Sequence, residues 1–410
     1  MKWFLLFFLL FPAFARAATI EVCKTCEVQA IDDAIARAKA GDIVKVQSGI
    51  YAGPLFIDKP LHLIGIGRPV IDGLHKEHVF YLRADDTTIE GFVIQNSGSS
   101  YISEYAGIRV EEAKGCRLLN NIFENNTYSI YLAKVDGCLV AQNQITGNAK
   151  DEVLSGNGVH AWYSSHIVIR QNDVQRHRDG LYLEFTPDSL VEENVISHNL
   201  RYGLHFMYSP GNRYFKNIFA ENQTGVAVMY SKNVEMLQNR FEKSWGRVSY
   251  GLLLKDISDS RIFGNRFSKN TVGIFADGIT RILFEQNDFK NNGWAVNILG
   301  NSEENIFSKN NFYENYFDVA TNTMSPLNTF ADNYWSGYRG YDLDRDGRGD
   351  VPFRPMKIFG LWISRYPELV SLLASPVIEF LEMAEKVFPV LTPKSLEDKT
   401  PSMKPLTAKL

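Results

Sequence analysis

The residues of this 410-residue chain that could bind a transition metal recur at a fixed spacing. Met207 and Met229 lie 22 residues apart, His205 lies two residues before Met207, and Glu184 occupies the position of Met207 one repeat earlier. His160 occupies the position of His205 two repeats earlier. Thioether and imidazole ligands suit a soft ion, above all Cu(I), so we expect a copper site here. The alternative is an outward surface of aromatic residues and methionines that only packs against a protein.

An acidic loop from residue 341 to residue 350 is a second candidate metal site. Four aspartates occupy positions 1, 3, 5 and 9 of a calcium-loop pattern, with glycine at position 6: Asp342, Asp344, Asp346, Asp350 and Gly347. Position 12 normally carries a bidentate acid, but Phe353 stands there. The pattern predicts calcium, with a simple Asp-rich turn that closes the last repeat as the alternative.

Two pairs of cysteines have spacings that favour pairing. Cys23 and Cys26 form a Cys-x-x-Cys motif, which in an oxidising compartment predicts a disulfide and otherwise offers two metal ligands. Cys116 and Cys138 are one repeat apart, so they should be neighbours in the core, as a packed ladder or as a disulfide.

A repeat of 22 or 23 residues must position these groups. The pattern Asn-x-(Ile/Val/Phe) and its final variant begin at Asn121, Asn143, Asn172, Asn194, Asn217, Asn239, Asn265, Asn287, Asn310 and Asn333. Each repeat contains three short alternating segments that end in Asn, Gly or Ser, and it lacks helical periodicity. Three short strands per coil predict a right-handed parallel β-helix rather than a leucine-rich repeat, whose Leu-x-x-Leu-x-Leu spacing is missing. We expect the recurrent asparagine to occupy a corner, where it tolerates left-handed backbone angles and bonds to the next asparagine.

Two steps of the repeat, of 29 and 26 residues, are longer than the others. Both extra segments fall between a recurrent asparagine and the following glycine-containing strand, so they should bulge at the same corner and flank the methionines. Before the first repeat, residues 28–40 form an amphipathic pattern that predicts a helix capping the open end of the solenoid.

The N-terminus resembles an export signal. Lys2 precedes an apolar run of twelve residues that is too short to span a bilayer, and Ala15-Arg16-Ala17 supplies small residues for cleavage after Ala17. We therefore assign 1–17 to a signal peptide and the protein to the periplasm. The mature chain would carry a net charge of −6 without a basic patch, which argues against nucleic acid as a partner.

The segments after residue 355 differ from the repeats. We assign 18–355 to the β-helix with its N-terminal cap and acidic loop, 356–391 to a broken helical segment with a broad apolar surface, and 392–410 to a flexible tail. Charges in the helical segment preclude a transmembrane span, so it should either cap the solenoid or dock on a partner.

Several motifs together resemble the NosD family of periplasmic copper-handling maturation proteins. They are Arg201-Tyr-Gly-Leu-His-Phe-Met-Tyr-Ser209, Tyr334-Trp-Ser-Gly337, the acidic loop with its sequel ending in Arg354-Pro355, and Ser364-Arg-Tyr-Pro367 followed by Ser375-Pro376. The resemblance covers almost the whole mature chain. It implies a role in assembling the copper-sulfur centre of nitrous oxide reductase, with an ABC-type ATPase (NosF type), a permease (NosY type) and a copper lipoprotein (NosL type) as partners. Peripheral membrane contact would then run through the permease, on which the helical segment would dock.

A carbohydrate-active β-helix enzyme, a lyase or glycosidase, is the main rival. Such chemistry needs paired carboxylates or a base with charge-neutralising cations, and only Asp179, Glu184 and Asp188 lie near the flanking bulges. Neighbouring repeats supply no matching second carboxylate, so we expect a protein without catalytic activity. A passive adhesin is a third reading, against which the specialised C-terminal segment argues.

Overall fold

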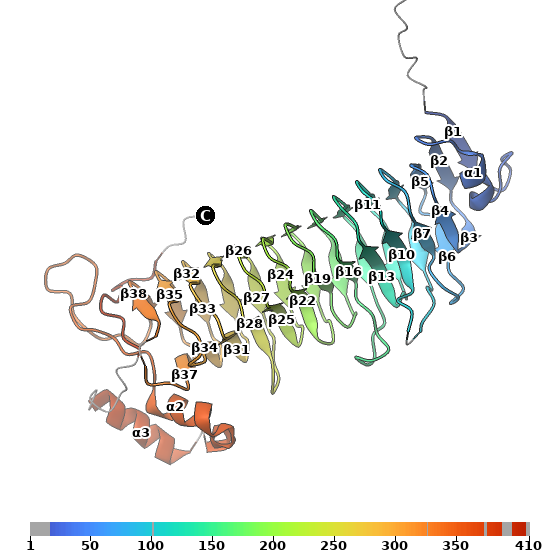
Figure 1. Cartoon of the computed structure of the whole chain (residues 1–410). Coiled ribbons are helices and arrows are strands. Elements are labelled where there is room, and N and C mark those ends of the chain that lie inside the picture. Colours follow the sequence, from blue (N-terminus) through green and yellow to red (C-terminus); the bar gives the residue numbers. More distant parts are fainter. Residues whose placement is uncertain (1–16, 101, 326, 373–374, 388–395, 407–410) are drawn as a thin grey trace, which may run out of the picture.

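The chain folds into one long parallel β-helix of about 14 coils with helices at both ends (Figure 1). The computed structural model describes residues 17–100, 102–325, 327–372, 375–387 and 396–406. Within these residues the strands form three parallel sheets, because each coil contributes one strand to each sheet and pairs with the coils before and after it. The predicted fold class is confirmed. Residues 1–16, which carry most of the predicted signal peptide, lie outside the described residues.

The first sheet begins beside the N-terminal helix and carries the strand that precedes each recurrent asparagine. Its members are β1 (Thr19–Val22), β2 (Ile43–Gln47), β5 (His62–Ile66), β8 (Thr88–Glu90), β11 (Arg117–Leu119), β14 (Leu139–Ala141), β17 (Val168–Arg170), β20 (Leu190–Glu192), β23 (Arg213–Phe215), β26 (Glu235–Leu237), β29 (Arg261–Phe263), β32 (Leu283–Glu285), β35 (Ile306–Ser308) and β38 (Thr329–Ala331).

The second sheet carries the strand that follows each recurrent asparagine. Its members are β3 (Ile50–Ala52), β6 (Val70–Asp72), β9 (Val93–Gln95), β12 (Ile122–Glu124), β15 (Gln144–Thr146), β18 (Asp173–Gln175), β21 (Val195–Ser197), β24 (Ile218–Ala220), β27 (Arg240–Glu242), β30 (Arg266–Ser268), β33 (Asp288–Lys290), β36 (Asn311–Tyr313) and β39 (Tyr334–Trp335).

The third sheet has the longest strands and holds the candidate copper ligands. Its members are β4 (Leu55–Ile57), β7 (Phe80–Leu82), β10 (Ala106–Glu111), β13 (Tyr128–Ala133), β16 (Val159–Trp162), β19 (Leu181–Glu184), β22 (Tyr202–Met207), β25 (Thr224–Met229), β28 (Tyr250–Lys255), β31 (Val272–Asp277), β34 (Trp294–Ile298) and β37 (Phe317–Thr321).

The recurrent asparagines form a buried hydrogen-bonded ladder along the corner between the first and second sheets. The backbone N–H of Asn194 donates to Oδ1 of Asn217 at 3.0 Å, and Nδ2 of Asn217 donates to the carbonyl of Val191 in the preceding coil at 2.8 Å. The same bonds recur from Asn121 to Asn333. The predicted amide ladder is therefore confirmed, but the predicted left-handed backbone is wrong for these asparagines. The positive φ belongs to the residue before each one, such as Lys216 with φ 54°.

Aromatic side chains fill the core of the later coils in register with the ladder. Phe219, Phe241, Phe267 and Phe289 stack face to face inside the second sheet, with ring centroids 4.6 to 5.4 Å apart. All four rings are fully buried. Because each coil places the same residue type above the last, the core grows by repetition and no coil is stable without its neighbours.

The N-terminal end is closed as predicted. Helix α1 (Ile31–Arg37) buries Ile31, Ala34 and Ile35 against β1, β2 and β4. Its buried face is the apolar stripe of the amphipathic pattern, and its position covers core that the first coil would otherwise expose.

The C-terminal helical segment packs on the outside of the last coils. Helix α2 (Ile358–Arg365), the 3-10 helix η1 (Pro367–Leu372) and helix α3 (Pro376–Val387) follow one another beside β37 (Figure 1). Phe359, Ile363 and Ile378 form a small separate core with Phe317 of β37. Among the helices of the described residues, none has the length and apolar character needed to cross a membrane.

Residues 396–406 pack against the last coil, so the expectation of a flexible tail is wrong for this stretch. Asp398 forms a parallel β-bridge with Phe330 of the first sheet, and Ser402 forms one with Tyr334 of the second. The Asp398 carboxylate is fully buried, and its Oδ2 accepts hydrogen bonds from the backbone and Nδ2 of Asn333 and from Nε1 of Trp335, each at 3.0 Å. Asp398 thus stands where the next asparagine of the ladder would stand, a role that composition could not reveal.

Asp398→Ala should destabilise the C-terminal end of the solenoid by about 3–5 kcal/mol, because three buried donors lose their acceptor at once. Asp398→Asn should cost about 1 kcal/mol, since an amide oxygen accepts these bonds in every other coil. Urea unfolding followed by intrinsic tryptophan fluorescence measures both variants. Equal losses for the two would contradict the role of Asp398 as the terminal member of the ladder.

Candidate metal centre

The third sheet brings the candidate copper ligands into two outward rows. In one row His160, Tyr182, His205 and Ala227 pair across β16, β19, β22 and β25, and in the other Trp162, Glu184, Met207 and Met229 pair in the same order. This register is the predicted one. It follows from the alternation of side chains along a strand, which leaves every second residue of each coil on the outer face.

Tyr182 is the residue that ties the two rows together. Its ring stacks on the imidazole of His205, with centroids 4.5 Å apart and planes 6° apart, and its hydroxyl donates to Sδ of Met207 at 3.6 Å. Sequence reasoning aligned Tyr182 with the two histidines but gave it no role. The stack fixes the plane of His205, because a rotation of the imidazole would collide with the phenol ring.

His205 is buried and chemically available. The residue is 6% exposed, and neither ring nitrogen has a hydrogen-bond partner among the described residues. Burial, with help from the nearby Arg201 and Arg178, lowers the pKa of His205 to about 4 against the opposing pull of Asp179. The imidazole is therefore neutral near pH 7, with a free lone pair that can bind a soft metal ion.

A buried ion pair lies directly beside His205. The Asp179 carboxylate is fully buried and accepts from Nε and Nη2 of Arg201 at 2.9 and 2.6 Å, and its Oδ2 lies 4.0 Å from Nδ1 of His205. Sequence reasoning considered Asp179 only as a catalytic acid. The signal that could have placed it was its position before Gly180, which matches Tyr202 before Gly203 one coil later.

Met207, Met229 and Glu184 are partly exposed, so an ion could reach them from solvent. Burial raises the pKa of the Glu184 carboxyl above its usual range, although the Tyr182 hydroxyl opposes the shift. Two thioethers and one neutral imidazole on adjacent strands suit Cu(I). Glu184 adds a weaker oxygen ligand and would favour the cation electrostatically.

The remaining histidines do not join this group. His160 on β16 contacts the Tyr182 ring at a tilt of 32°, with centroids 4.7 Å apart, whereas His205 lies on β22 on the other side of β19, so Tyr182 separates the two imidazoles. Burial lowers the pKa of His160 to about 3. His177 lies in hydrogen-bond contact with Ser129, and His198 pairs with Glu221, so both imidazoles are engaged with groups other than the candidate ligands.

The two long repeat steps form loops at the same corner, between the second and third sheets, as predicted (Figure 1). The first loop, after β15, lines a cavity of about 280 Å³ through residues such as Lys150, together with His177 and Asn126. This cavity does not include the candidate copper ligands. The loops therefore flank the methionine strands without covering them.

The acidic loop brings three of its four aspartates together. Oxygen atoms of Asp342, Asp344 and Asp346 all lie within 4.8 Å of one another, whereas Asp350 accepts from the backbone N–H of Leu343 at 2.7 Å. Phe353 packs on Trp335 in the core, which explains why position 12 carries no acid. The loop can offer a cation three carboxylates without the bidentate ligand of a full calcium loop.

Both cysteine pairs are joined. The structure links Cys23 to Cys26 and Cys116 to Cys138 by disulfides, and the second lies in the core between β11 and β14. In this state none of the four sulfur atoms is a thiolate, so none is available as a ligand of the kind that binds copper.

The acids considered for carbohydrate chemistry do not form a pair. The Asp179 carboxylate is held by Arg201, and five residue steps of extended chain place its Cα about 16 Å from that of Glu184, at about 3.3 Å per residue. Glycosidases place their two carboxyl groups about 5–9.5 Å apart. Asp188 lies exposed in the next corner and has a φ of 53°.

Comparison of the sequence with known families and proteins gives a consistent result. The sequence model of the family described as "Periplasmic copper-binding protein (NosD)" matches residues 70–156 and 142–340. A protein of Pseudomonas aeruginosa, named "Probable ABC transporter binding protein NosD", is 30% identical over 401 residues, which cover 93% of this chain and 92% of that protein. A protein of the same name from Stutzerimonas stutzeri is 28% identical and covers 89% of this chain and 88% of its own length.

Solved structures resemble the fold at low sequence identity. PfbA, a surface adhesin of Streptococcus pneumoniae, superposes with a TM-score of 0.57 at 12% identity, over 75% of this chain and 88% of its own. A GH87 alpha-1,3-glucanase from Streptomyces thermodiastaticus superposes with a TM-score of 0.60 at 15% identity, over 75% of this chain and 62% of its own. An adhesin and an enzyme share this solenoid, so these two likenesses show the fold and say nothing of activity.

Proposed function

The chain belongs to the NosD family of periplasmic copper-binding proteins, and we propose that it is a non-catalytic factor that handles copper during assembly of the copper-sulfur centre of nitrous oxide reductase. The observation that supports this proposal is the strand register, which places His205, Met207 and Met229 on the outer face of two adjacent strands, with Met207 directly opposite Met229. Periplasmic localisation follows from the family description and from the export signal predicted in the sequence.

The ligand set suits transient binding. His205 is held by the ring stack with Tyr182, whereas the two methionines are flexible and partly exposed. A closed cage of thiolates would bind copper too tightly for release, whereas thioethers are weaker ligands that a partner can replace one at a time. Glu184 would assist at the same site, and His160 would act separately on the far side of Tyr182.

The double variant His205→Ala/Met207→Ala should weaken Cu(I) binding more than about 100-fold. Loss of a residue that only supports a metal ligand usually weakens metal binding about 10–100-fold, and this variant removes two ligands. Competition with a chromophoric Cu(I) chelator measures the affinity. His166→Ala/Met324→Ala removes the same residue types from exposed positions elsewhere and should leave the affinity unchanged. Unchanged binding in the first variant would remove His205 and Met207 from the site.

An ABC-type ATPase and permease are the proposed membrane partners, and α3 is the proposed contact. Val377, Phe380 and Met383 are 72, 73 and 64% exposed on one apolar face of α3, while Ile378 is buried against α2 and β37. An amphipathic helix with an open apolar face next to a packed one is suited to a groove on a partner. We propose that the NosL-type copper lipoprotein and nitrous oxide reductase bind elsewhere on the solenoid.

Phe380→Asp/Met383→Asp should abolish co-purification with the permease and ATPase, because a docked face would have to bury two unpaired charges. Val153→Asp places the same charge at an exposed apolar position in a loop and should co-purify normally. The melting temperature should be unaffected in both variants, since all three side chains are exposed. Normal co-purification of the α3 variant would locate the contact elsewhere.

Calcium at the acidic loop is an accessory proposal that rests on the clustered oxygen atoms of Asp342, Asp344 and Asp346. Calcium at 100 times its dissociation constant should stabilise the C-terminal coils by about 2.7 kcal/mol, seen as a rise in melting temperature that EDTA reverses. Asp344→Asn should abolish the rise, and Asp173→Asn, at an exposed strand position, should keep it. A rise that persists in Asp344→Asn would exclude the loop.

The rival function, a carbohydrate-active enzyme, predicts turnover of a polysaccharide by the purified protein. The engagement of Asp179 by Arg201 and its distance from Glu184 argue against it. Release of reducing or unsaturated sugars that is lost in Glu184→Gln would favour the enzyme over the copper-handling factor.

A further inference from the structure

A column of four aromatic rings runs along the corner between the third and first sheets. Tyr163, Phe185, Tyr208 and Tyr230 stack on one another in consecutive coils, with centroids 4.6, 5.1 and 5.0 Å apart and planes within 20° of parallel. Tyr163, Tyr208 and Tyr230 are 53, 42 and 38% exposed. The column is therefore a rigid aromatic surface rather than part of the core.

The backbone makes this column unusual. All four residues have φ between 46° and 52°. Among the described residues, no other Phe, Tyr or Trp has a positive φ. Bulky side chains rarely adopt this region, and short polar residues are favoured there. Aromatic side chains at four successive left-handed corners thus run against the local preference of the backbone.

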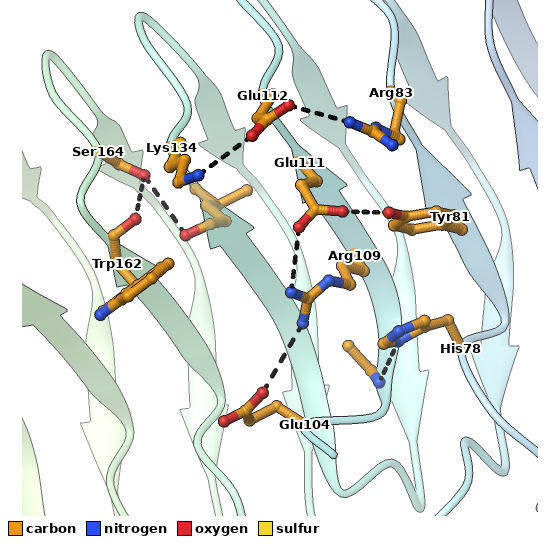
Figure 2. A network of polar contacts seen from close by, with 12 residues as sticks. His78, Tyr81, Arg83, Glu104, Arg109, Glu111, Glu112, Lys134, Trp162 and Ser164 are labelled. Atoms are coloured by element: carbon orange, nitrogen blue, oxygen red, sulfur yellow. Dashed lines mark hydrogen bonds and ion pairs between the residues drawn. The ribbon is translucent and has the colours of Figure 1, made fainter.

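The same corner in adjoining coils carries charges instead. On one side Arg83, Glu112 and Lys134 form a chain of ion pairs at 2.9 and 3.1 Å (Figure 2). On the other side the next corner residue is Asp256, exposed and with φ 50°. Charged residues therefore satisfy this corner well, and the fold does not require aromatic rings there.

The aromatic column coincides with the candidate copper row. Each ring follows its row partner directly in the chain, since Phe185, Tyr208 and Tyr230 come immediately after Glu184, Met207 and Met229. The column begins with Tyr163, beside Trp162, and ends with Tyr230 at the second methionine. A surface that borders the ligands over their full length, and stops where they stop, is placed to contact whatever approaches them.

The geometry of the stack selects a protein as the occupant. Because the rings lie nearly parallel, both faces of Phe185 and Tyr208 and one face of each end ring are covered by a neighbouring ring, so the column offers mainly ring edges and tyrosine hydroxyls. A sugar that stacks on an aromatic residue needs an exposed ring face. Tyrosine edges and hydroxyls are instead typical of the centres of protein interfaces, because a tyrosine side chain loses little conformational entropy when it is bound.

We propose that the aromatic column is the docking surface for a Cu(I)-carrying protein that loads the His205, Met207 and Met229 site. This inference rests on the proposed copper-handling function. Met207 and Met229 are the partly exposed ligands that directly precede Tyr208 and Tyr230, and the buried imidazole of His205 lies two residues farther from the column on the same strand as Met207, stacked on Tyr182. An ion would pass from the carrier to a thioether first and reach His205 afterwards.

The test compares loading from a protein with loading from a small molecule. The donor protein is the copper lipoprotein proposed above, purified without its lipid anchor and loaded with Cu(I), and the small donor is the Cu(I)–bicinchoninate complex. Tyr208→Asn/Tyr230→Asn removes two rings with a residue that favours positive φ. Lys134→Asn/Asp256→Asn makes the matched change at the same corner outside the column.

Transfer from the protein donor should slow about tenfold in the column variant, as expected for the loss of two central interface tyrosines, while loading from bicinchoninate stays unchanged. The matched control should behave as wild type in both assays. Tyr208→Lys/Tyr230→Lys, which extends the charged corner that the fold already tolerates, should slow transfer at least as much and guards against misfolding of the first variant.

Equal protein-to-protein rates in the column variants and the wild type would overturn the docking proposal. If, in that case, His205→Ala/Met207→Ala fails to take up Cu(I) from the bicinchoninate complex, the copper site stands and only the docking surface is wrong. If that variant binds normally, the proposed function itself fails. Loss of binding to soluble glycan strands in the column variants, with unchanged transfer, would assign the column to carbohydrate and likewise overturn the proposal.

Discussion

Each coil of this protein is held to the next by an asparagine side chain that satisfies backbone groups at a corner where the sheets cannot. Between the first and second sheets the chain turns, and the N–H at the turn has no strand opposite it. The amide of the asparagine in the following coil accepts from this N–H, and its own Nδ2 reaches back to a carbonyl of the coil before. Because an unpaired buried N–H costs about 1–3 kcal/mol, any other stacking register would lose several such bonds at every coil. The outward rows depend on this constraint, since a slip of one residue would turn Met207 and Met229 into the core.

The repeat, the three sheets and the register of the outward rows were predictable because they follow from period and alternation. Asn217 and Asn239 are 22 residues apart for the same reason that Met207 and Met229 are. What could not be predicted depends on side-chain contacts between coils. The stack of Tyr182 on His205, the ion pair of Asp179 with Arg201 and the capping carboxylate of Asp398 each require three-dimensional distances. An abundance of asparagine suggests two roles for it, a left-handed corner residue and a member of an amide ladder. The ladder asparagines have only the second role, and the residue before each of them has the positive φ, which only the backbone geometry reveals.

The candidate centre combines a fixed ligand with mobile ones, and each part depends on its neighbours. Burial keeps His205 neutral, but a buried imidazole without hydrogen bonds is costly unless something holds it, and Tyr182 supplies that support through its ring. Arg201 disfavours the protonated imidazole, while Asp179 partly neutralises Arg201 and so limits the unfavourable positive charge near an incoming cation. The methionines need no such support, since a thioether carries no charge and adapts to the ion.

The position of this centre along the solenoid separates it from the proposed membrane contact. Helix α2 packs on β37, four coils beyond β25, and neighbouring strands of a sheet lie about 4.8 Å apart, so the two regions are about 19 Å apart along the axis. The coils between them are joined by the ladder Asn239, Asn265, Asn287 and Asn310 and by stacked phenylalanines. Such a segment is stiff, because bending it would stretch the amide bonds on one side. A carrier bound at the aromatic column would therefore leave α3 free for its own partner, and one chain could hold a copper donor and a membrane complex at the same time.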